Sequence, residues 1–434
     1  MTILSVLDQS PIRAGSTPAE ALQETLKLAE LCDRLGYHRY WLAEHHSTGG
    51  LAGSAPEIMI GQVAGRTRNL RVGSGGVMLS HYSSLKVAES FRMLESLYPG
   101  RIDLGIGRAP GSDGLTANAL AHGPGALGIE HFPSQIRDVQ AWIRGDLPED
   151  HPFRQVTAMP AGETNPQIWL LGSSDHSAAY AAYFGMAFSF AHFINAQGGP
   201  LVMEAYRRHF EASAELSAPH GSIGIFVICA DTEEEAKELR WSRDLWSLRL
   251  RTGQTGPVPT VEEAKNYPYT DQEWAIVEFN RPRTIAGNPD QCAAQIRELE
   301  EAYDVDEFVI VTICDTFEAR LRSYELLAER FALAPARAAS PAERTPNRTS
   351  ARWRFSSAVA SCIAWACAAA AVGNEPRRAP RKRDFGSHRE RSPRERSPVP
   401  DATQLTPPLS TSPLPHRFAR TIAHAVPRTT QSWT

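Results

Sequence analysis

Cysteine is scarce and scattered in this sequence. Six cysteines occur in 434 residues, and no two of them form a CxxC pair. That spacing excludes a disulfide scaffold and argues against a zinc ribbon, since both need closely spaced thiols. Scattered thiols are typical of a reducing compartment, so we expect a cytoplasmic protein. The six are Cys32, Cys229, Cys292, Cys314, Cys362 and Cys367.

Long apolar runs are missing from residues 1–335. No segment there approaches the roughly 20 apolar residues of a membrane span. The first 15 residues also lack the charged start and the long apolar stretch of a signal peptide. Residues 356–373 are apolar but Ala-rich and short. We therefore expect no membrane association.

Acidic residues are scarce at one end of the chain and abundant in the rest. Residues 336–434 hold 17 Lys and Arg against six Asp and Glu, a net charge of +11. Residues 1–335 hold the remaining 28 basic and 43 acidic residues, a net charge of −15. The two parts are different kinds of polypeptide. The acidic body argues against nucleic acid as its partner.

The C-terminal segment, residues 336–434, lacks both helical and strand periodicity. It contains 12 of the 31 prolines, 16 arginines and one lysine, Lys382. Such low-complexity sequence does not form a packed core. We expect a disordered extension, or a segment translated from a shifted reading frame, because a GC-rich gene read out of frame gives Arg, Pro and Ala with little Lys. We base no function on it.

Residues 1–335 alternate between apolar strands and amphipathic helices. Apolar runs without polar alternation predict parallel strands buried on both faces. About eight strand–helix units in this length predict a (β/α)8 TIM barrel with insertions. The predicted strands are residues 2–7, 37–43, 70–79, 101–107, 167–172, 186–193, 224–230 and 307–312. The predicted helices are 18–35, 55–66, 83–97, 231–250 and 317–331.

A dinucleotide-binding glycine motif is absent after the first strand. A doubly wound open sheet is the rival fold, and the missing GxGxxG weakens it. Residues 251–290 lack clear periodicity and contain several prolines and glycines. We interpret them as an insertion after the seventh strand, placed to act as a lid by analogy with active-site loops.

Polar residues follow the predicted strands, where barrel enzymes keep their functional groups. Glu44, His45 and His46 follow the second strand. Histidine titrates near neutrality, so this cluster can supply an acid/base pair, a metal site or a purely structural pair. A metal site needs three or four ligands. The further candidates, Asp8 and His192, are unspecific, and we assign no metal.

A serine-rich helix start follows the fifth strand, with Gly172, Ser173, Ser174 and Ser177 in sequence. Free N–H groups and the helix dipole favour an anion there, and hydroxyls add donors. A plain serine N-cap is the alternative. Arg108, after the fourth strand, could complete a phosphate site or form a surface salt bridge.

Two glycines, Gly75 and Gly76, interrupt the third strand. Glycine weakens a strand, and it often marks a bulge or the close approach of a ligand. A flat cofactor ring needs such an approach. A tolerant turn is the alternative interpretation.

Taken in this order, these segments resemble the bacterial luciferase-like, flavin-dependent monooxygenase superfamily (LLM class oxidoreductases). The resemblance spans roughly residues 1–335. It is densest in WLAEHHS (41–47), SAPEIMIGQVAGRTRNLRVGSGGVML (54–79), LKVAESFRMLESLYPGRIDLGIGRAPG (85–111) and LLGSSDHSA (170–178). The combination is specific, although each motif alone is not.

The resemblance implies a (β/α)8 barrel that binds FMN, usually as FMNH2. The family's histidine beside the flavin matches His45, and its phosphate-binding arginine matches Arg108. Its phosphate-binding Ser/Thr positions match Ser174 and Ser177. The family's non-proline cis peptide under the flavin ring would fall at Gly75–Gly76. Luciferase carries a reactive cysteine just before the arginine, where this chain has glycine, so we expect no light emission.

We therefore predict an FMN-dependent oxidoreductase of the two-component monooxygenase type. Its catalytic residues would be His45, helped by Glu44 and His46. It would use FMNH2 from a separate NAD(P)H-flavin reductase, O2 and a small organic substrate, and the resemblance implies a homodimer. The alternatives are an F420-dependent hydride-transfer enzyme, a non-catalytic flavin-binding barrel, and an inactive product damaged in its tail.

Overall fold

The computed structural model describes residues 2–109, 111–121 and 128–334. The predicted tail, 336–434, lies outside the described residues. Within them, no helix combines the length and the apolar character that crossing a membrane requires.

Nine strands occur in the described residues, and all their pairings are parallel. Strands β1 to β6 pair in sequence, β6 pairs with β7, β7 with β9, and β9 with β1. These eight close into a cylinder, so the predicted TIM barrel is confirmed. The strands are β1 (Ile3–Asp8), β2 (Arg39–Leu42), β3 (Arg71–Met78), β4 (Ile102–Gly107), β5 (Gln167–Gly172), β6 (Ala187–Ala191), β7 (Gly221–Cys229), β8 (Thr284–Gly287) and β9 (Glu307–Val311).

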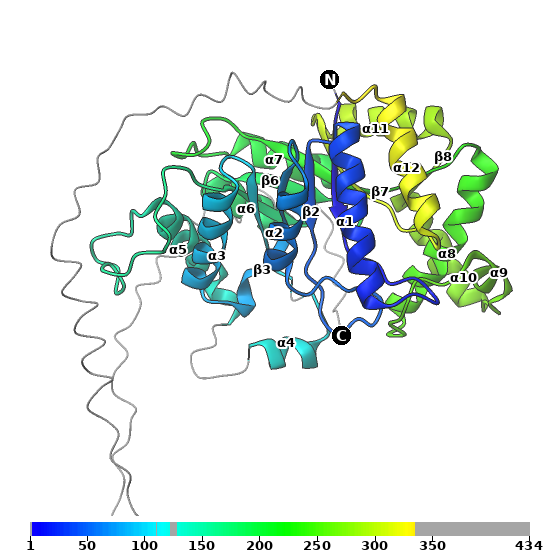
Figure 1. Ribbon diagram of the computed structural model, residues 1–434, viewed down its shortest axis with the longest axis horizontal. Helices are drawn as coiled ribbons and strands as arrows, with labels where there is room; N and C mark the ends of the chain where they lie inside the picture. Colours follow the sequence, from blue (N-terminus) through cyan, green and yellow to red (C-terminus); the bar gives the residue numbers. More distant parts are fainter. Residues whose placement is uncertain (1, 110, 122–127, 335–434) are drawn as a thin grey trace, which may run out of the picture. The chain divides into compact units, whose positions relative to one another are not determined.

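Helices surround this cylinder. On its outside, α1 packs against both α2 and α12, and Figure 1 shows it in front of the strands. The helices are α1 (Pro18–Leu35), α2 (Pro56–Arg66), α3 (Ser84–Leu97), α4 (Gly114–Leu120), α5 (Phe132–Arg144), α6 (Asp175–Tyr183), α7 (Gly199–Arg208), α8 (Glu233–Arg251), α9 (Val261–Asn266), α10 (Asp271–Asn280), α11 (Pro289–Tyr303) and α12 (Phe317–Arg330).

Local sequence sets the ends of α1. Thr17 and Glu20 form a capping box at its start, where each side chain accepts a hydrogen bond from the other residue's backbone N–H. Gly36 ends the helix in the left-handed conformation, with φ of 91°. The predicted bounds, 18–35, are therefore confirmed.

Residues 251–290, interpreted as an insertion after the seventh strand, lie between β7 and β9 and contain regular elements that the sequence pattern did not show. They include α9, α10 and β8, and β8 pairs with Phe226–Cys229 of β7 outside the closed cylinder. Leu245 and Leu248 of α8 pack with Ala264 and Val277 in a small separate core. Each helix is short, so few positions carry the helical period and the pattern is lost among the prolines and glycines.

Side chains of each strand alternate between two cores. Those facing out pack under the helices, and those facing in fill the barrel. The inward set from β1, β2, β5, β6, β7 and β9 is Leu7, Trp41, Trp169, Ala187, Phe226, Val309 and Val311.

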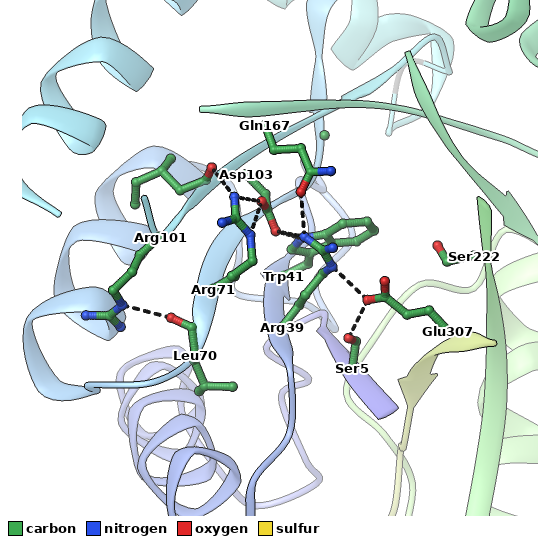
Figure 2. Close-up of polar contacts among 12 residues, drawn as sticks. Ser5, Arg39, Trp41, Leu70, Arg71, Arg101, Asp103, Gln167, Ser222 and Glu307 are labelled. Atoms are coloured by element: carbon green, nitrogen blue, oxygen red, sulfur yellow. Dashed lines mark hydrogen bonds and ion pairs between the residues drawn. The ribbon is translucent and has the colours of Figure 1, made fainter. Parts of the chain in front are cut away.

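Charged groups fill the barrel at its amino end, where the strands begin. Arg39 donates to Asp103 Oδ2 at 2.9 Å and to Glu307 Oε1 at 2.7 Å, as Figure 2 shows. Its guanidinium also lies 4.7 Å from the centre of the Trp169 ring. Each of these buried charges has a partner, which burial requires. Residues at the amino end of a barrel contribute to stability, whereas functional groups lie at the carboxyl ends of the strands.

Candidate functional site

The segments that follow β2, β3 and β4 are joined by hydrogen bonds at the carboxyl end of the barrel. The Met78 N–H donates to Glu44 Oε2 at 3.0 Å, and the His46 N–H donates to the Gly111 carbonyl at 3.1 Å. Within the β2 loop, the His45 N–H donates to the Gly53 carbonyl at 2.8 Å. The predicted EHH cluster is therefore held against two neighbouring strands.

Glu44 is almost fully buried, at 1% exposure, and its carboxylate has three donors. The Tyr82 hydroxyl donates to Oε1 at 2.7 Å, and His46 Nε2 lies 2.8 Å from the same oxygen. Met78 N–H serves the other oxygen. A carboxylate that accepts hydrogen bonds on both oxygens is held in one orientation, and it orients the groups that donate to it. Here Glu44 fixes the orientation of the His46 imidazole.

His45 differs from His46, because its ring lacks a protein partner. The side chain as a whole is only partly buried, but the Nδ1 atom is fully buried and forms no hydrogen bond in the described residues. Burial, with a smaller contribution from His46, lowers the pKa of His45 to about 4. The imidazole is neutral at physiological pH, so Nδ1 or Nε2 can accept a hydrogen bond.

The peptide between Gly75 and Gly76 is cis, as the resemblance implied. Both glycines are also demanded by packing. A Cβ on Gly75 would lie 2.5 Å from Leu7 Cδ1, and one on Gly76 would lie 2.7 Å from the Gly105 carbonyl oxygen. The barrel's own atoms approach here too closely for any side chain, which the turn interpretation does not explain.

The predicted anion-binding groups follow two adjacent strands. Gly107 of β4 pairs with Leu171 of β5, so Arg108 and Gly172 leave the barrel side by side. Arg108 is half-buried and has no hydrogen bond or ion pair with any described residue. Ser174 is the N-cap of α6 but makes no side-chain cap bond.

Ser177 completes this group. Its Oγ lies 3.5 Å from Ser174 Oγ, and its side chain is 5% exposed. A Cβ on Gly172 would collide with it. Two hydroxyls, the first turn of α6, where the His176 N–H already donates to the Asp175 carboxylate, and a guanidinium without a partner in the described residues therefore lie at neighbouring strand ends. Apart from that carboxylate, the arrangement suits a phosphate.

The two further candidates for a metal site have structural partners. Asp8 binds Arg320 at 2.7 Å and Tyr40 at 2.5 Å, and His192 Nδ1 lies 2.7 Å from the Tyr303 hydroxyl. In the parts of the chain that the structure describes, no three His, Cys, Asp or Glu side chains are grouped to hold a metal ion.

Residues 2–305 match the family model of luciferase-like monooxygenases. The chain belongs to this family. Two relatives from Bacillus subtilis (strain 168) support the assignment. The uncharacterized protein YceB is 46% identical over 331 residues, which are 76% of this chain and 100% of YceB. An N-acetyl-S-alkylcysteine monooxygenase is 39% identical over 334 residues, covering 76% of this chain and 98% of the relative.

Several solved structures show the same barrel. Apo-MsnO8 matches with a TM-score of 0.71 and 38% identity, covering 77% of this chain and all of that chain. Two structures below 25% identity share the fold alone. One is the oxygenating constituent of 3,6-diketocamphane monooxygenase from Pseudomonas putida in complex with FMN, with a TM-score of 0.56. The other is an F420-dependent secondary alcohol dehydrogenase, with a TM-score of 0.55.

The residues present fit a flavin of this family. Its phosphate would meet Arg108, Ser174 and Ser177, which have no better partner in the described chain. Its ring would lie toward the Nδ1 of His45, which has no partner in the described residues. These are groups that a ligand would satisfy, since buried polar atoms normally have a partner.

Sequence reasoning missed several side chains at this end of the barrel. Tyr82, beyond β3, holds Glu44 and carries no motif. Thr48 Oγ1 is buried without a partner in the described residues beside the end of β2. So is Oε1 of Gln9, which belongs to the polar cluster directly after β1 but was assigned no role from the sequence. Arg243, in the middle of α8, gave no signal at all, because a helical arginine is ordinarily exposed.

Proposed function

We propose that the chain is an FMN-dependent monooxygenase of the two-component type. It would use reduced FMN, O2 and a small organic substrate. The observation that carries this is a set of groups at the carboxyl end of the barrel: His45 Nδ1 and the Arg108 guanidinium, which have no partner in the described residues, and the hydroxyls of Ser174 and Ser177, which are paired only with each other. The monooxygenase named among the relatives supports it.

In this proposal the flavin phosphate is held at the start of α6. Arg108 neutralises its charge, while Ser173, Ser174 and Ser177 donate through hydroxyl or backbone groups. Gly172 lets Ser177 approach the strand end. A phosphate carries two negative charges, so a cation and a helix N-terminus together favour FMN over riboflavin.

The ring would rest beside Gly75 and Gly76. Bound reduced FMN supplies the electrons that allow O2 to react with an organic substrate. His45, neutral above about pH 4, accepts a hydrogen bond or a proton beside the ring. Glu44 and His46 would assist His45 in this role. Glu44 fixes His46, and the backbone of this loop fixes the direction of His45.

Partners and location follow as proposals. A two-component enzyme needs a separate NAD(P)H-flavin reductase, and a homodimer is inferred from the family resemblance. The four cysteines in the described residues are free and buried, which supports a reducing, cytoplasmic setting.

An F420-dependent hydride transfer is the second candidate, favoured by the structural likeness to the F420-dependent alcohol dehydrogenase. Anaerobic titration with FMN, photoreduced FMN and F420, followed by Trp fluorescence, separates the two. We expect tight binding of reduced FMN only. Binding of F420 alone would overturn the proposal, and binding of flavin without any O2-dependent product would favour a non-catalytic barrel.

A further inference from the structure

Arg243 is a buried arginine with unsatisfied donors. Its side chain projects from the middle of α8 and is 4% exposed. Both Nε and Nη1 are buried without a hydrogen-bond partner, and no ion pair to Arg243 exists within the described residues. The guanidinium carbon lies 4.0 Å from the centre of the Phe226 ring. This cation–π contact with β7 offsets part of the loss of water.

The position of Arg243 is the carboxyl end of the barrel. Phe226 belongs to the inward-facing core, and so does Trp246, one turn beyond Arg243 on α8. A Cβ on Gly50 would lie 3.2 Å from Trp246 Nε1, so this turn of α8 packs against the loop after β2. That loop also carries His45. Arg243 and the proposed reaction site therefore lie at the same end of the barrel.

No acidic side chain forms an ion pair or a hydrogen bond with Arg243 in the described residues. Its neighbour Asp244 attracts the cation, but the Asp244 carboxylate is bound by Arg281 at 2.8 Å. The pKa of Arg243 falls to about 10, because burial lowers it more than Asp244 raises it, and the cations Arg251 and Arg283 make smaller contributions that also lower it. The group stays charged at physiological pH. A buried guanidinium with unfilled donors is unfavourable, and an anion bound to those donors would relieve it.

The surroundings of the guanidinium are apolar. The rings of Phe226 and Phe193 meet edge to face, with centroids 5.3 Å apart. Phe193 packs onto Gly224, where a Cβ would lie 2.7 Å from its ring. A cation on the Phe226 ring, with Phe193 packed beside that ring, suits a ligand with a carboxylate at one end and an apolar body.

We propose that Arg243 binds the carboxylate of the substrate, which is an organic acid with an apolar body. This inference rests on the proposed function for the reaction itself, and it names the substrate class of that same site. The acid would pair with the Nε–Nη edge of the guanidinium, while its apolar part lies along Phe226 and Phe193. Bidentate pairing of this kind is the usual mode of arginine with carboxylates.

The test compares one acid with its neutral analogue. Binding of 3-phenylpropanoate and of 3-phenylpropanamide to the full chain is measured by calorimetry, with and without photoreduced FMN, under anaerobic conditions. We expect the acid to bind at least about 30-fold more tightly than the amide, as a desolvated charge pair would give. Arg243→Met should abolish that preference, and Arg243→Lys should restore part of it.

Lys237→Met is the matched control, because it removes one positive charge from an exposed position of the same helix and does not act on Arg243. It should keep the preference for the acid. Equal binding of acid and amide to the wild type, absence of acid binding at millimolar concentration, or an unchanged preference in Arg243→Met would each overturn the proposal.

The flavin is measured separately in the same samples. Arg243→Met should bind reduced FMN as the wild type does. A large loss of FMN affinity in that variant would place the guanidinium on the flavin and overturn the proposal. Selective acid binding by a wild type that binds no FMN would support the role of Arg243 and contradict the proposed cofactor.

Discussion

The backbone N–H of Met78 donates a 3.0 Å hydrogen bond to the carboxylate of Glu44. This bond ties the end of β3, just beyond Gly75 and Gly76, to the residue that precedes His45. The same carboxylate also receives the Tyr82 hydroxyl and His46. A single buried side chain thus fixes the relative positions of two segments of the candidate site.

Replacing Glu44 should destabilise the protein. In Glu44→Gln one oxygen becomes an amide NH2, which faces the Met78 N–H or the Tyr82 hydroxyl and leaves a buried donor unpaired. We expect a loss of about 2 kcal/mol in the free energy of unfolding, measured with urea, and about 1 kcal/mol for Tyr82→Phe. Glu57→Gln, at an exposed position of α2, is the control and should be neutral. A neutral Glu44→Gln would contradict the positioning role.

His45 should make stability depend on pH. Its pKa falls from 6.5 in the unfolded chain to about 4 in the folded protein. The unfolded chain therefore binds the extra proton first. Protonation of His45 therefore does not affect the free energy of unfolding above pH 6.5. As the pH falls from 6.5 toward 4, it lowers that free energy by on the order of 2–3 kcal/mol.

The measurement is the difference between wild type and His45→Asn in urea unfolding at several pH values. The wild type should lose more stability than the variant between pH 6.5 and 4, because other groups titrate equally in both. Parallel curves would show that His45 titrates normally. Substrate oxidation by the variant, with FMNH2 supplied, should fall at least about 100-fold if His45 moves a proton.

Arg108 should set the preference for FMN over riboflavin. Arg108→Met removes the cation beside the proposed phosphate, so FMN should bind about 10- to 100-fold more weakly while riboflavin is unaffected. Equilibrium titration of both flavins measures this. Arg297→Met, an exposed arginine of α11, should leave both affinities unchanged. Equal losses for FMN and riboflavin would place Arg108 away from the phosphate.

Gly76 should not tolerate even alanine. The added methyl would lie 2.7 Å from the Gly105 carbonyl oxygen and 2.8 Å from Leu171 Cδ1. Overpacking of this kind destabilises by about 1–3 kcal/mol. Gly114→Ala, where a Cβ meets nothing within 4 Å, should be neutral or slightly stabilising. Thermal unfolding of both variants measures the contrast, and a stable Gly76→Ala would show that the strands can separate here.

Much of the fold was predictable because its signals are local. Apolar runs marked the eight strands of the cylinder, and Pro18 with Gly36 marked the ends of α1. The short elements α9, α10 and β8 were missed. The helices α9 and α10 are stabilised by packing on α8. A segment of four to ten residues is too short for its periodicity to indicate a helix or a strand.

The candidate site divides in the same way. The sequence by itself determined the barrel and the strand ends where His45, Arg108 and Ser174 leave it, because side-chain period and strand order follow from nearest neighbours in the chain. Only the tertiary structure decided which polar atoms lack partners. His45 and His46 are adjacent, yet Glu44 satisfies His46, while the buried Nδ1 of His45 has no partner in the described residues. Arg243 is buried because α8 packs it against Phe226 of β7. The sequence does not show this, since the burial of a charge depends on residues that are far apart in the chain.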